Sequence, residues 1–231
     1  MISLQGVERI FQVGEEEVHA LREVSFTVES GEYIAIMGPS GSGKSSLLNI
    51  IGLLDRPDRG LYLLDGEEVS GLDDNRQAEV RRHRIGFVFQ FFHLVPRLSA
   101  AENIELPLTL AGVEPAVRKR RVQSALAAFG LAERARHRPD QLSGGQRQRV
   151  AIARATIMEP QVILADEPTG NLDHSSGSEV IEILEGLNRR GMTLIMVTHD
   201  PELGARARRT IRMMDGRLES DSRKLGSTLS D

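Results

Sequence analysis

Residues 38–45 read Gly-Pro-Ser-Gly-Ser-Gly-Lys-Ser, and the expected fold can be built outward from this stretch. The five residues before it, 33–37, are apolar and rich in strand formers. The residues after it, 46–51, have the composition of the first turns of a helix. A buried strand that leads through a glycine-rich loop into a helix is the setting that a phosphate-binding loop requires.

The residue types in this loop suit a nucleoside triphosphate. Glycines let backbone N–H groups approach phosphate oxygens closely, and the helix N-terminus adds partial positive charge. Lys44 can reach the β- and γ-phosphates, and the Ser45 hydroxyl can hold Mg²⁺. An ordinary glycine-rich turn is the alternative, but the complete GxxxxGK[ST] pattern in this setting argues against it. The residues expected to bind the nucleotide here are Gly38, Pro39, Ser40, Gly41, Ser42, Gly43, Lys44, Ser45 and Ser46.

The composition is that of an ordinary globular protein and argues against several function classes. The chain has 231 residues, of which 40% are hydrophobic and 27% charged, with a formal net charge of −4. That charge offers no electrostatic case for nucleic-acid binding, and without cysteine no disulfide or thiolate metal site can form. No apolar run reaches the length of a membrane span, and no signal peptide is indicated. If the protein works at a membrane, we expect another chain to span it.

The sequence patterns near the two ends of the chain predict β-hairpins. Residues 2–28 alternate between apolar and polar side chains around a glycine- and glutamate-rich turn, which predicts a β-hairpin and a returning strand. Phe11 on this hairpin either packs like most strand aromatics or stacks on a nucleotide base. Residues 211–218 contain an Asp-Gly turn, which favours a second hairpin. From 221 to 231 we expect a loose polar tail.

Residues 91–160 differ from the rest because helical periodicity replaces strand signals. Pro115 suits a first helical turn, and apolar residues at 122, 125, 126 and 129 follow the spacing of one helix face. We therefore expect a mostly helical subdomain at 91–160, inserted into a core formed by 1–90 and 161–220. Its first residues, 91–96, are unusually apolar for a loop. They either tuck under the helices or form a docking groove for a partner.

Residues 142–146 read Leu-Ser-Gly-Gly-Gln and open another helix. Ser143 as N-cap and Gln146 at the third helical position form a capping box, which is a sufficient structural reading for both side chains. Gly144 and Gly145 are harder to explain in this way, because each costs on the order of 1 kcal/mol of helix stability relative to alanine. A ligand phosphate that approaches a bare helix N-terminus would account for them.

Polar side chains follow three strands that should be buried. Residues 162–165 are continuously apolar, as in a buried parallel strand, and end in Asp166 and Glu167. Paired carboxylates there suit Mg²⁺ anchoring by Asp166 and orientation of an attacking water by Glu167; a mere capping role for Glu167 is the alternative. Residues 85–89 end at Gln90 and residues 194–197 lead to His199. Ligands of open α/β sheets bind at that carboxyl edge, although a lone histidine is usually just packed or exposed.

These elements, in this order, resemble the nucleotide-binding domain of the ABC transporter superfamily, over residues 4–218. The resemblance implies a P-loop α/β core with a mostly parallel sheet, an N-terminal antiparallel β subdomain and the helical insertion. It implies that Gln90 links Mg²⁺ and the attacking water to a partner subunit, that His199 contacts the γ-phosphate and that Phe11 stacks on adenine. The loop 171–173, which ends at Asp173, would cross a dimer interface.

Finer resemblance points to the branch of lipoprotein-releasing and macrolide-exporter ATPases. The strings at 54–57, 102–108 and 167–173 carry it. By this resemblance the chain is an ATPase subunit whose two copies stack head to tail around two ATP molecules with Mg²⁺. Each Ser143–Gln146 helix end would then face the γ-phosphate held by the other copy. The catalytic group would consist of Lys44, Gln90, Glu167 and His199.

The same resemblance leaves the role of the complex open. We expect a cytoplasmic subunit on the inner face of the cell membrane, which drives separate permease subunits that dock at 91–96. An ATPase that regulates or scaffolds a membrane complex without transport, as cell-division relatives do, is the alternative. A DNA- or ribosome-acting ATPase is disfavoured, because the chain has no long coiled-coil insertion, no second phosphate loop and no net positive charge.

Overall fold

The computed structural model describes residues 1–14 and 16–223. The chain forms two compact units, one of residues 1–78 and 193–231 and the other of residues 79–192. The core and helical subdomain expected from the sequence divide the chain at other residues, and that functional division stays a prediction. The fold class is confirmed: an antiparallel sheet, parallel strands and a group of helices are all present.

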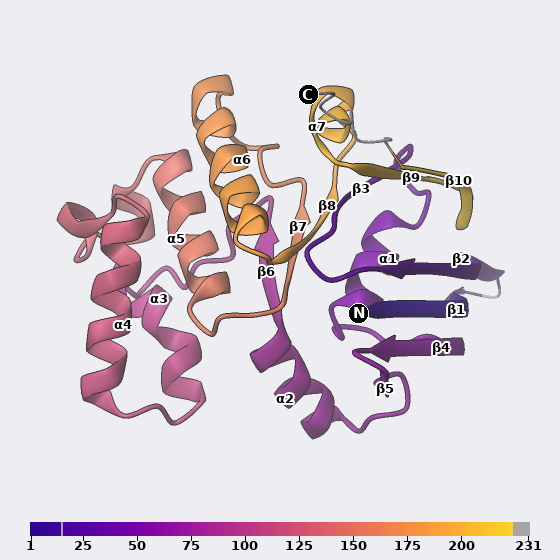
Figure 1. Ribbon diagram of the computed structural model, residues 1–231, viewed down its shortest axis with the longest axis horizontal. Coiled ribbons are helices and arrows are strands. Elements are labelled where there is room, and N and C mark those ends of the chain that lie inside the picture. The colour runs from indigo at the N-terminus through magenta and orange to yellow at the C-terminus, as the bar shows by residue number, and fades with distance from the viewer. Residues whose placement is uncertain (15, 224–231) are drawn as a thin grey trace, which may run out of the picture. The chain divides into compact units, whose positions relative to one another are not determined.

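The first unit begins with an antiparallel sheet of order β2-β1-β4-β5 (Figure 1). Its strands are β1 (Ile2–Val13), β2 (Glu16–Val28), β4 (Arg59–Leu64) and the short β5 (Glu67–Glu68). The predicted N-terminal hairpin is therefore confirmed. Strand β1 pairs with β2 along its whole length, from Ile2↔Val28 to Val13↔Glu16, but with β4 only as far as Glu8↔Arg59. Its last residues consequently form a two-stranded ribbon with β2.

The first unit also holds four strands in the order β10-β9-β3-β8. Strand β3 (Tyr33–Met37) runs parallel to both β8 (Thr193–Val197) and β9 (Arg209–Met214), and β10 (Arg217–Arg223) returns antiparallel to β9. The unit's helices are α1 (Lys44–Ile51) and α7 (Pro201–Arg206). Strand β8 is buried at every residue, as expected for a parallel strand covered on both faces.

The second unit joins two parallel strands to a group of helices. Strands β6 (Ile85–Phe89) and β7 (Val162–Asp166) pair from Ile85↔Val162 to Phe89↔Asp166. The α-helices are α3 (Ala100–Leu110), α4 (Pro115–Ala128), α5 (Gly144–Thr156) and α6 (His174–Arg189), with 3₁₀ turns at Ala132–Arg134 and Pro139–Gln141. Helix α2 (Asp74–Arg84) contains the boundary between the units.

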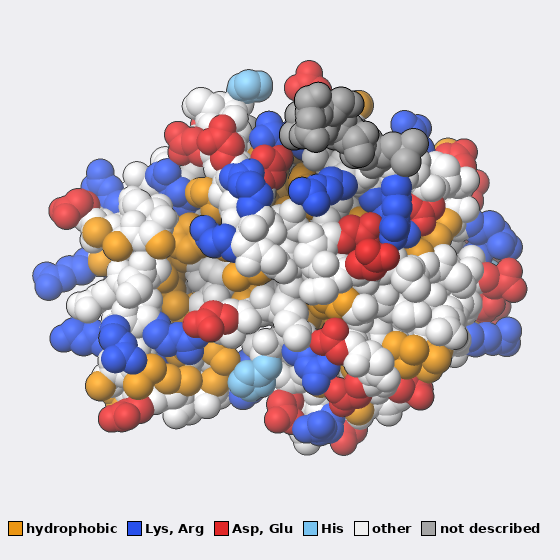
Figure 2. All heavy atoms as spheres, viewed as in Figure 1, with side chains coloured by type: hydrophobic (Ala, Val, Ile, Leu, Met, Phe, Trp, Pro, Cys, Tyr) orange, Lys and Arg blue, Asp and Glu red, His pale blue; other side chains and the backbone are white. Residues whose placement is uncertain are grey.

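The surface carries both signs of charge. Lys and Arg side chains are interspersed with Asp and Glu over most of the face in Figure 2. Such a mixture gives no large field of one sign on this face. In the part of the chain that the structure describes, none of the helices is both long and apolar enough to cross a membrane.

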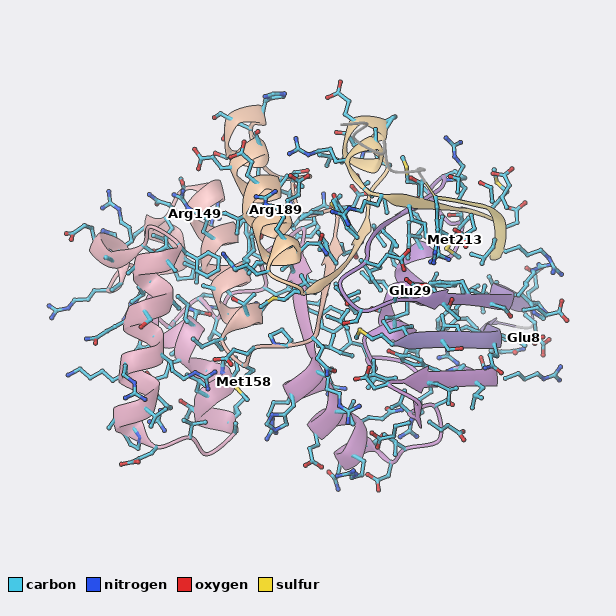
Figure 3. The ribbon with its side chains drawn as sticks, in the orientation of Figure 1. Glu8, Glu29, Arg149, Met158, Arg189 and Met213 are labelled. Carbon is cyan, nitrogen blue, oxygen red and sulfur yellow. The ribbon has the colours of Figure 1, made fainter. Side chains whose placement is uncertain are left out.

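The helices of the second unit bury a core of their own. Met158 packs against its edge (Figure 3), and Arg149 on α5 forms an ion pair of 3.0 Å with Glu179 on α6. Helices α3, α4 and α5 contribute apolar faces to this core, and the face of α4 is the one that the periodicity predicted. Buried members of this core are Ala100, Ile104, Leu108, Val122, Leu126, Leu131, Leu142, Val150, Ala153 and Ile157.

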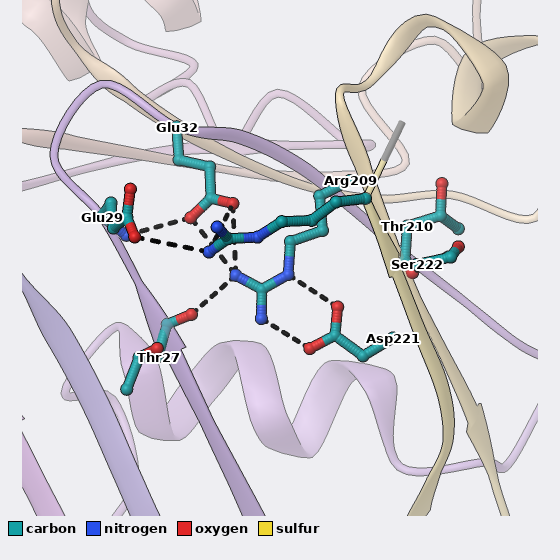
Figure 4. A network of polar contacts seen from close by, with 8 residues as sticks. Thr27, Glu29, Glu32, Arg209, Thr210, Asp221 and Ser222 are labelled. Atoms are coloured by element: carbon teal, nitrogen blue, oxygen red, sulfur yellow. Dashed lines mark hydrogen bonds and ion pairs between the residues drawn. The ribbon is translucent and has the colours of Figure 1, made fainter. Parts of the chain in front are cut away.

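In the first unit, a buried arginine holds the C-terminal hairpin to the turn before β3 (Figure 4). Arg209 is 5% exposed and donates to both carboxylate oxygens of Asp221, at 2.6 and 2.5 Å. Its Nη1 donates to the carbonyl oxygen of Thr27 at 2.8 Å and to Glu32 at 3.2 Å. The bonds to Asp221 and Glu32 outweigh burial and raise the pKa of Arg209. The guanidinium is therefore charged and well satisfied.

The expectation of a loose tail from residue 221 is wrong for its first residues. Strand β10 continues to Arg223, which pairs with Arg209 on β9. A physical reason is the buried Arg209 on β9, whose guanidinium is bound by the carboxylate of Asp221 on β10. Residues 224–231 of the expected tail lie outside the described residues.

Asp221→Asn should lower the free energy of unfolding by about 1–2 kcal/mol near neutral pH, because Arg209 keeps its burial but loses a charged acceptor that is partly screened by water. The bond from Arg209 lowers the pKa of Asp221 in the folded protein. Its contribution is therefore present above the unfolded pKa of about 4 and is lost as the pH falls below it. Urea unfolding of both proteins should show a difference that persists from about pH 7 to about pH 5 and shrinks below about pH 4.

Glu219→Gln is the matched control for Asp221→Asn, because Glu219 is exposed on the same strand. It should change the free energy of unfolding by less than about 0.5 kcal/mol. Equal losses in the two variants, or a difference that grows on acidification, would contradict the role assigned to Asp221.

Candidate nucleotide-binding site

The phosphate loop connects the end of β3 to the start of α1. Gly43, the last loop residue before α1, is the N-cap of that helix. It has a left-handed backbone with φ 96° and supplies no side-chain cap. The first turn of α1, from Lys44 through Ser45 and Ser46, contains no acidic side chain. The helix N-terminus therefore keeps its partial positive charge and its unpaired N–H groups available for an anion.

Two glycines of the loop lie where a side chain cannot fit. A Cβ at Gly38 would collide with the carbonyl oxygen of Met213 on β9 (labelled in Figure 3) and would lie 2.7 Å from the Ser42 hydroxyl. A Cβ at Gly43 would collide with the carbonyl oxygen of Ala20 on β2. Both glycines also have φ between 90° and 160°, at 156° and 96°. The loop backbone thus lies directly against two strands, which explains why glycine stands at these positions.

The polar groups of the loop fit a phosphate ligand. The Lys44 ammonium donates to the carbonyl oxygens of Gly38 at 2.9 Å and Pro39 at 2.7 Å, so it lies over the loop. Ser42 is 2% exposed, and among the described residues its hydroxyl has no hydrogen-bond partner. A buried hydroxyl without a partner is costly unless a ligand satisfies it. Ser40, Gly41 and Ser45 are exposed.

His199 lies at the same sheet edge as the phosphate loop. Strands β3 and β8 run parallel with Ile36 opposite Val197, and the N–H of Thr198 donates to the carbonyl oxygen of Ile36 at 3.2 Å. His199 follows directly and is exposed. The structure therefore brings this predicted site residue and the loop, far apart in sequence, to the carboxyl edge of one group of strands.

Phe11 lies on the two-stranded ribbon of β1 and β2. It is 38% exposed, so it is not a packed core residue. It stands directly opposite Val18 on β2, two residues before Ala20, whose carbonyl oxygen lies against Gly43 of the phosphate loop. Two residues of a strand span about 7 Å, so Phe11 lies a short step along the ribbon from the contact between β2 and the phosphate loop, and its part in base binding stays a prediction.

In the second unit, the pairing of β6 with β7 aligns Gln90 with the two carboxylates. Phe89 lies opposite Asp166, and Gln90 and Glu167 are the residues that directly follow the ends of the two strands. Glu167 has a left-handed backbone with φ 45°, a strained conformation for glutamate that is common at functional sites. The Asn171 side chain donates to the Gln90 carbonyl oxygen at 3.1 Å, and a Cβ at Gly170 would lie 2.5 Å from the Gln90 amide nitrogen.

Sequence reasoning missed Gln148, which joins these two strand ends. It is fully buried on α5, and its Nε2 donates to the carbonyl oxygens of Phe89 at 3.2 Å and Pro168 at 2.6 Å. These carbonyls flank Gln90 and Glu167 in the chain. The available signal was an amide side chain on the apolar face of a helix, which must have buried partners.

The Ser143–Gln146 motif forms the predicted capping box. The Ser143 hydroxyl accepts from the Gln146 N–H at 3.2 Å, and the Gln146 side chain accepts from the Ser143 N–H at 3.0 Å. A Cβ at Gly144 would lie 3.0 Å from the Leu172 side chain, and a Cβ at Gly145 would lie 3.0 Å from Ser176. Close packing against the start of α6 is therefore a second reason for both glycines, besides the phosphate that the sequence suggested.

Asp173 caps α6 in this structure. Its carboxylate accepts from the Ser176 N–H at 3.0 Å and from the Ser175 hydroxyl at 2.7 Å. These hydrogen bonds, that of the Ser176 backbone first, lower the pKa of Asp173. The residue is thus an ionised helix cap, and its predicted part in nucleotide binding stays a prediction.

The apolar loop at 91–96 is partly tucked and partly exposed. Leu94 packs on the helical core, whereas Phe91 is 69% exposed. Phe92 and His93 both have left-handed backbones, and the Arg154 guanidinium donates to their carbonyl oxygens at 3.0 and 2.7 Å. Burial lowers the pKa of Arg154. Leu94 is therefore tucked under the helices, as one alternative from the sequence expects, and a docking groove for a partner stays a prediction.

A parallel strand, a glycine-rich loop that opens a helix and acidic residues after another parallel strand together define a P-loop nucleoside triphosphatase. A family model described as ABC transporter matches residues 21–170. An uncharacterized ABC transporter ATP-binding protein of Thermotoga maritima is 53% identical, over 97% of this chain and 96% of that protein. Macrolide export ATP-binding/permease protein MacB 2 of Aeromonas hydrophila is 51% identical over 96% of this chain, which spans 34% of that longer protein.

The solved structures that resemble this chain come from the same family as these relatives. A dimeric structure of MJ0796, a bacterial ABC transporter cassette, matches with a TM-score of 0.90 and 44% identity, over 98% of this chain and 100% of that one. A dimeric post-hydrolysis state of the same cassette, bound to ADP and Pi, also has a TM-score of 0.90, with 43% identity. The chain belongs to the ABC transporter family and is one of its ATP-binding, ATP-hydrolysing components.

Gln148→Glu should destabilise the protein by about 2–4 kcal/mol, because a carboxylate would face two buried carbonyl oxygens in place of an N–H donor. Displacement of Gln90 and Glu167 should lower ATP turnover at least about tenfold. Affinity for ATP should change less than about twofold, since the phosphate loop lies in the other unit. Thermal melting, steady-state hydrolysis and calorimetric titration of ATP measure the three effects.

Gln123→Glu is the control for this substitution, because it makes the same chemical change at an exposed position of α4. It should leave all three measurements unchanged. Full hydrolysis by a folded Gln148→Glu protein would show that the bridge between the strand ends is dispensable.

Proposed function

We propose that the chain is the ATP-hydrolysing subunit of a transport or extrusion complex, and that two copies bind head to tail around two ATP molecules and drive a separate membrane permease. One observation carries the proposal. Among the α-helices of the described residues, α1 and α5 are those with no acidic side chain at the N-cap or in the first turn. Acidic residues occupy one of these positions in each of the others, as Asp74, Glu102, Glu114, Asp173 and Asp200.

An uncompensated helix N-terminus favours an anion. The N-terminus of α1 follows the phosphate loop. The N-terminus of α5 is formed by Ser143, Gly144 and Gly145. A γ-phosphate held between an α1 of one copy and an α5 of the other would use both. We propose this arrangement for Ser143–Gln146 and Asp173. Its support is the 98% coverage by a relative whose structure is described as dimeric.

The oxygen atoms that the candidate site provides suit Mg²⁺ as the metal that accompanies ATP. In residues 1–14 and 16–223, no group of three or more His, Cys, Asp or Glu side chains is placed to hold a metal ion. Mg²⁺ is commonly held by one or two protein oxygens together with substrate phosphates. We assign Ser45, Gln90 and Asp166 as its protein ligands. When bound, the ion would neutralise charge on the β- and γ-phosphates.

The chain's own residues then divide the work of phosphoryl transfer to water. Lys44 draws the β- and γ-phosphates into the loop, and Phe11 holds the base. Glu167 orients the attacking water, with Gln90 beside it, and His199 contacts the γ-phosphate. Catalysis is thereby positioning and electrostatic stabilisation of developing charge.

We propose that the loop 91–96 docks the permease on the inner face of the membrane. Its exposed Phe91, next to a backbone that Arg154 holds rigid, provides an apolar contact on a fixed support. The relative named an ATP-binding/permease protein carries both functions in one longer chain. Co-purification from membranes identifies the partner here, and a transport assay with that partner separates a transporter from a complex that the ATPase only regulates.

Glu167→Gln should retain ATP binding while turnover falls at least about hundredfold, because the amide cannot accept the water proton. Trapped ATP should also favour a dimer over the monomer. Steady-state hydrolysis, nucleotide titration and light scattering after size exclusion test these outcomes. Glu182→Gln, at an exposed position on α6, is the control and should behave as the wild type. Retained hydrolysis in Glu167→Gln would remove Glu167 from this role.

Ser143→Arg should reduce hydrolysis at least about tenfold, because a bulky cation would occupy the place of the partner's γ-phosphate. Nucleotide affinity of the monomer should stay within about twofold, since the phosphate loop is untouched. Ser124→Arg adds the same side chain to the exposed face of α4 and should have no effect. Loss of ATP binding by the monomeric Ser143→Arg protein would mean that Ser143 serves its own chain's nucleotide.

A further inference from the structure

An arginine covers one face of the Phe11 ring. The guanidinium carbon of Arg9 lies 4.5 Å from the ring centroid, within the range of a cation–π contact. The two residues lie two positions apart on β1, which places their side chains on the same side of the ribbon. Phe11 is 38% exposed, so part of the ring is open to solvent while Arg9 lies against it.

Two carboxylates of the loop after α1 hold Arg9 in this position. Its Nε donates to Asp55 at 2.8 Å, and its Nη1 donates to both oxygens of Asp58 at 3.1 and 3.0 Å. The Arg9 side chain is only 21% exposed. Burial lowers the pKa of Arg9, but the bonds to Asp58 and Asp55 outweigh it and the net pKa is raised. A guanidinium fixed by several charge-assisted bonds is not free to swing away.

Asp55 and Asp58 together form a clamp on Arg9, and Asp58 also bonds to the backbone of β1. The Asp58 carboxylate accepts from the Ile10 N–H at 2.7 Å, and the Asp58 N–H donates to the carbonyl oxygen of Glu8 at 2.9 Å (Glu8 is labelled in Figure 3). These bonds fall where β1 shifts its register against β2, on either side of Arg9. The loop therefore fixes both the irregular backbone and the arginine that it carries.

We propose that Arg9 is a positioning residue for the nucleotide base: clamped by Asp55 and Asp58, it backs one face of Phe11 and holds the ring so that the other face receives a purine. The inference rests on the proposed function, in which Phe11 stacks on the base. A phenylalanine on a two-stranded ribbon would otherwise rotate about χ1 and χ2, and each orientation that misses the base lowers the affinity. Arg9 removes that freedom before the nucleotide arrives.

The test compares ATP with inorganic tripolyphosphate, both with Mg²⁺, by calorimetric titration. Tripolyphosphate occupies the phosphate loop but has no base, so it reports on that loop alone. Arg9→Met should weaken ATP binding about two- to fivefold, as loss of a partly exposed cation–π contact implies, and should leave tripolyphosphate binding unchanged. Phe11→Ala should weaken ATP binding at least about fivefold. In the double variant, loss of Arg9 should add nothing to loss of Phe11.

Arg56→Met is the matched control. Arg56 lies in the same loop and makes a comparable set of bonds, to Asp74 at 2.8 Å, the Leu72 carbonyl oxygen at 2.8 Å and Gln77 at 3.3 Å, with no ring contact in the described structure. Its replacement should leave both affinities unchanged. Equal loss of ATP affinity in Arg56→Met and Arg9→Met, or weaker tripolyphosphate binding in Arg9→Met, would overturn the inference in favour of a structural role.

Other outcomes separate this inference from the proposed function. Wild-type affinity for ATP in Arg9→Met, with a loss in Phe11→Ala, would overturn the role of Arg9 and leave base stacking intact. Wild-type affinity in Phe11→Ala would overturn both. A wild-type protein that binds neither ligand would overturn nucleotide binding itself. If Arg9→Met does not fold, Asp55→Asn loosens the clamp with Arg9 in place, and the same contrast between ATP and tripolyphosphate decides the question.

Discussion

The close approach of the phosphate loop to two strands is the constraint on which the site depends. Gly38 and Gly43 lie against carbonyl oxygens of Met213 on β9 and Ala20 on β2, where a Cβ would collide. The loop backbone is thereby held on both sides. This fixes the position of the N-terminus of α1, which has no capping side chain. Preorganised donors of this kind bind charge with little reorganisation. Because β2 also pairs with β1 at Phe11, the same strand connects the phosphate loop to the ring that is proposed to stack on the base.

The strand ends of the second unit are organised by α5. Gln148 joins the residues before Gln90 and after Glu167, and Arg154 holds the two carbonyls at the start of the apolar loop. The same helix begins with the Ser143 capping box. A displacement of α5 would consequently move the strand ends, the loop and the Ser143–Gly145 turn together. This shared support connects the loop that is proposed to dock a permease with the strand ends that carry Gln90 and Glu167.

Two clusters of charged side chains in the first unit, each centred on an arginine, hold separate segments of the chain together. Arg209 draws Asp221 and Glu32 together, and Arg9 draws Asp55 and Asp58 onto β1. Each guanidinium joins segments that are distant in sequence, and Arg209 binds Asp221 through Nε and Nη2 in a fork geometry that a lysine could not supply. Removing one partner would leave a buried charge unsatisfied, so these clusters specify position more than they add net stability.

The sequence by itself determined the phosphate loop, most strands and helices, the Ser143 capping box and the acidic strand end, because local patterns of glycine, apolar and capping residues encode them. Tertiary structure alone decided that Gln148 bridges two strands, that Gly144 and Gly145 also pack closely against Leu172 and Ser176, and that β10 continues through Asp221 to Arg223. It also decided that Arg9 backs Phe11. Each of these depends on contacts between residues far apart in sequence or on backbone irregularities, whose partners no local period can indicate.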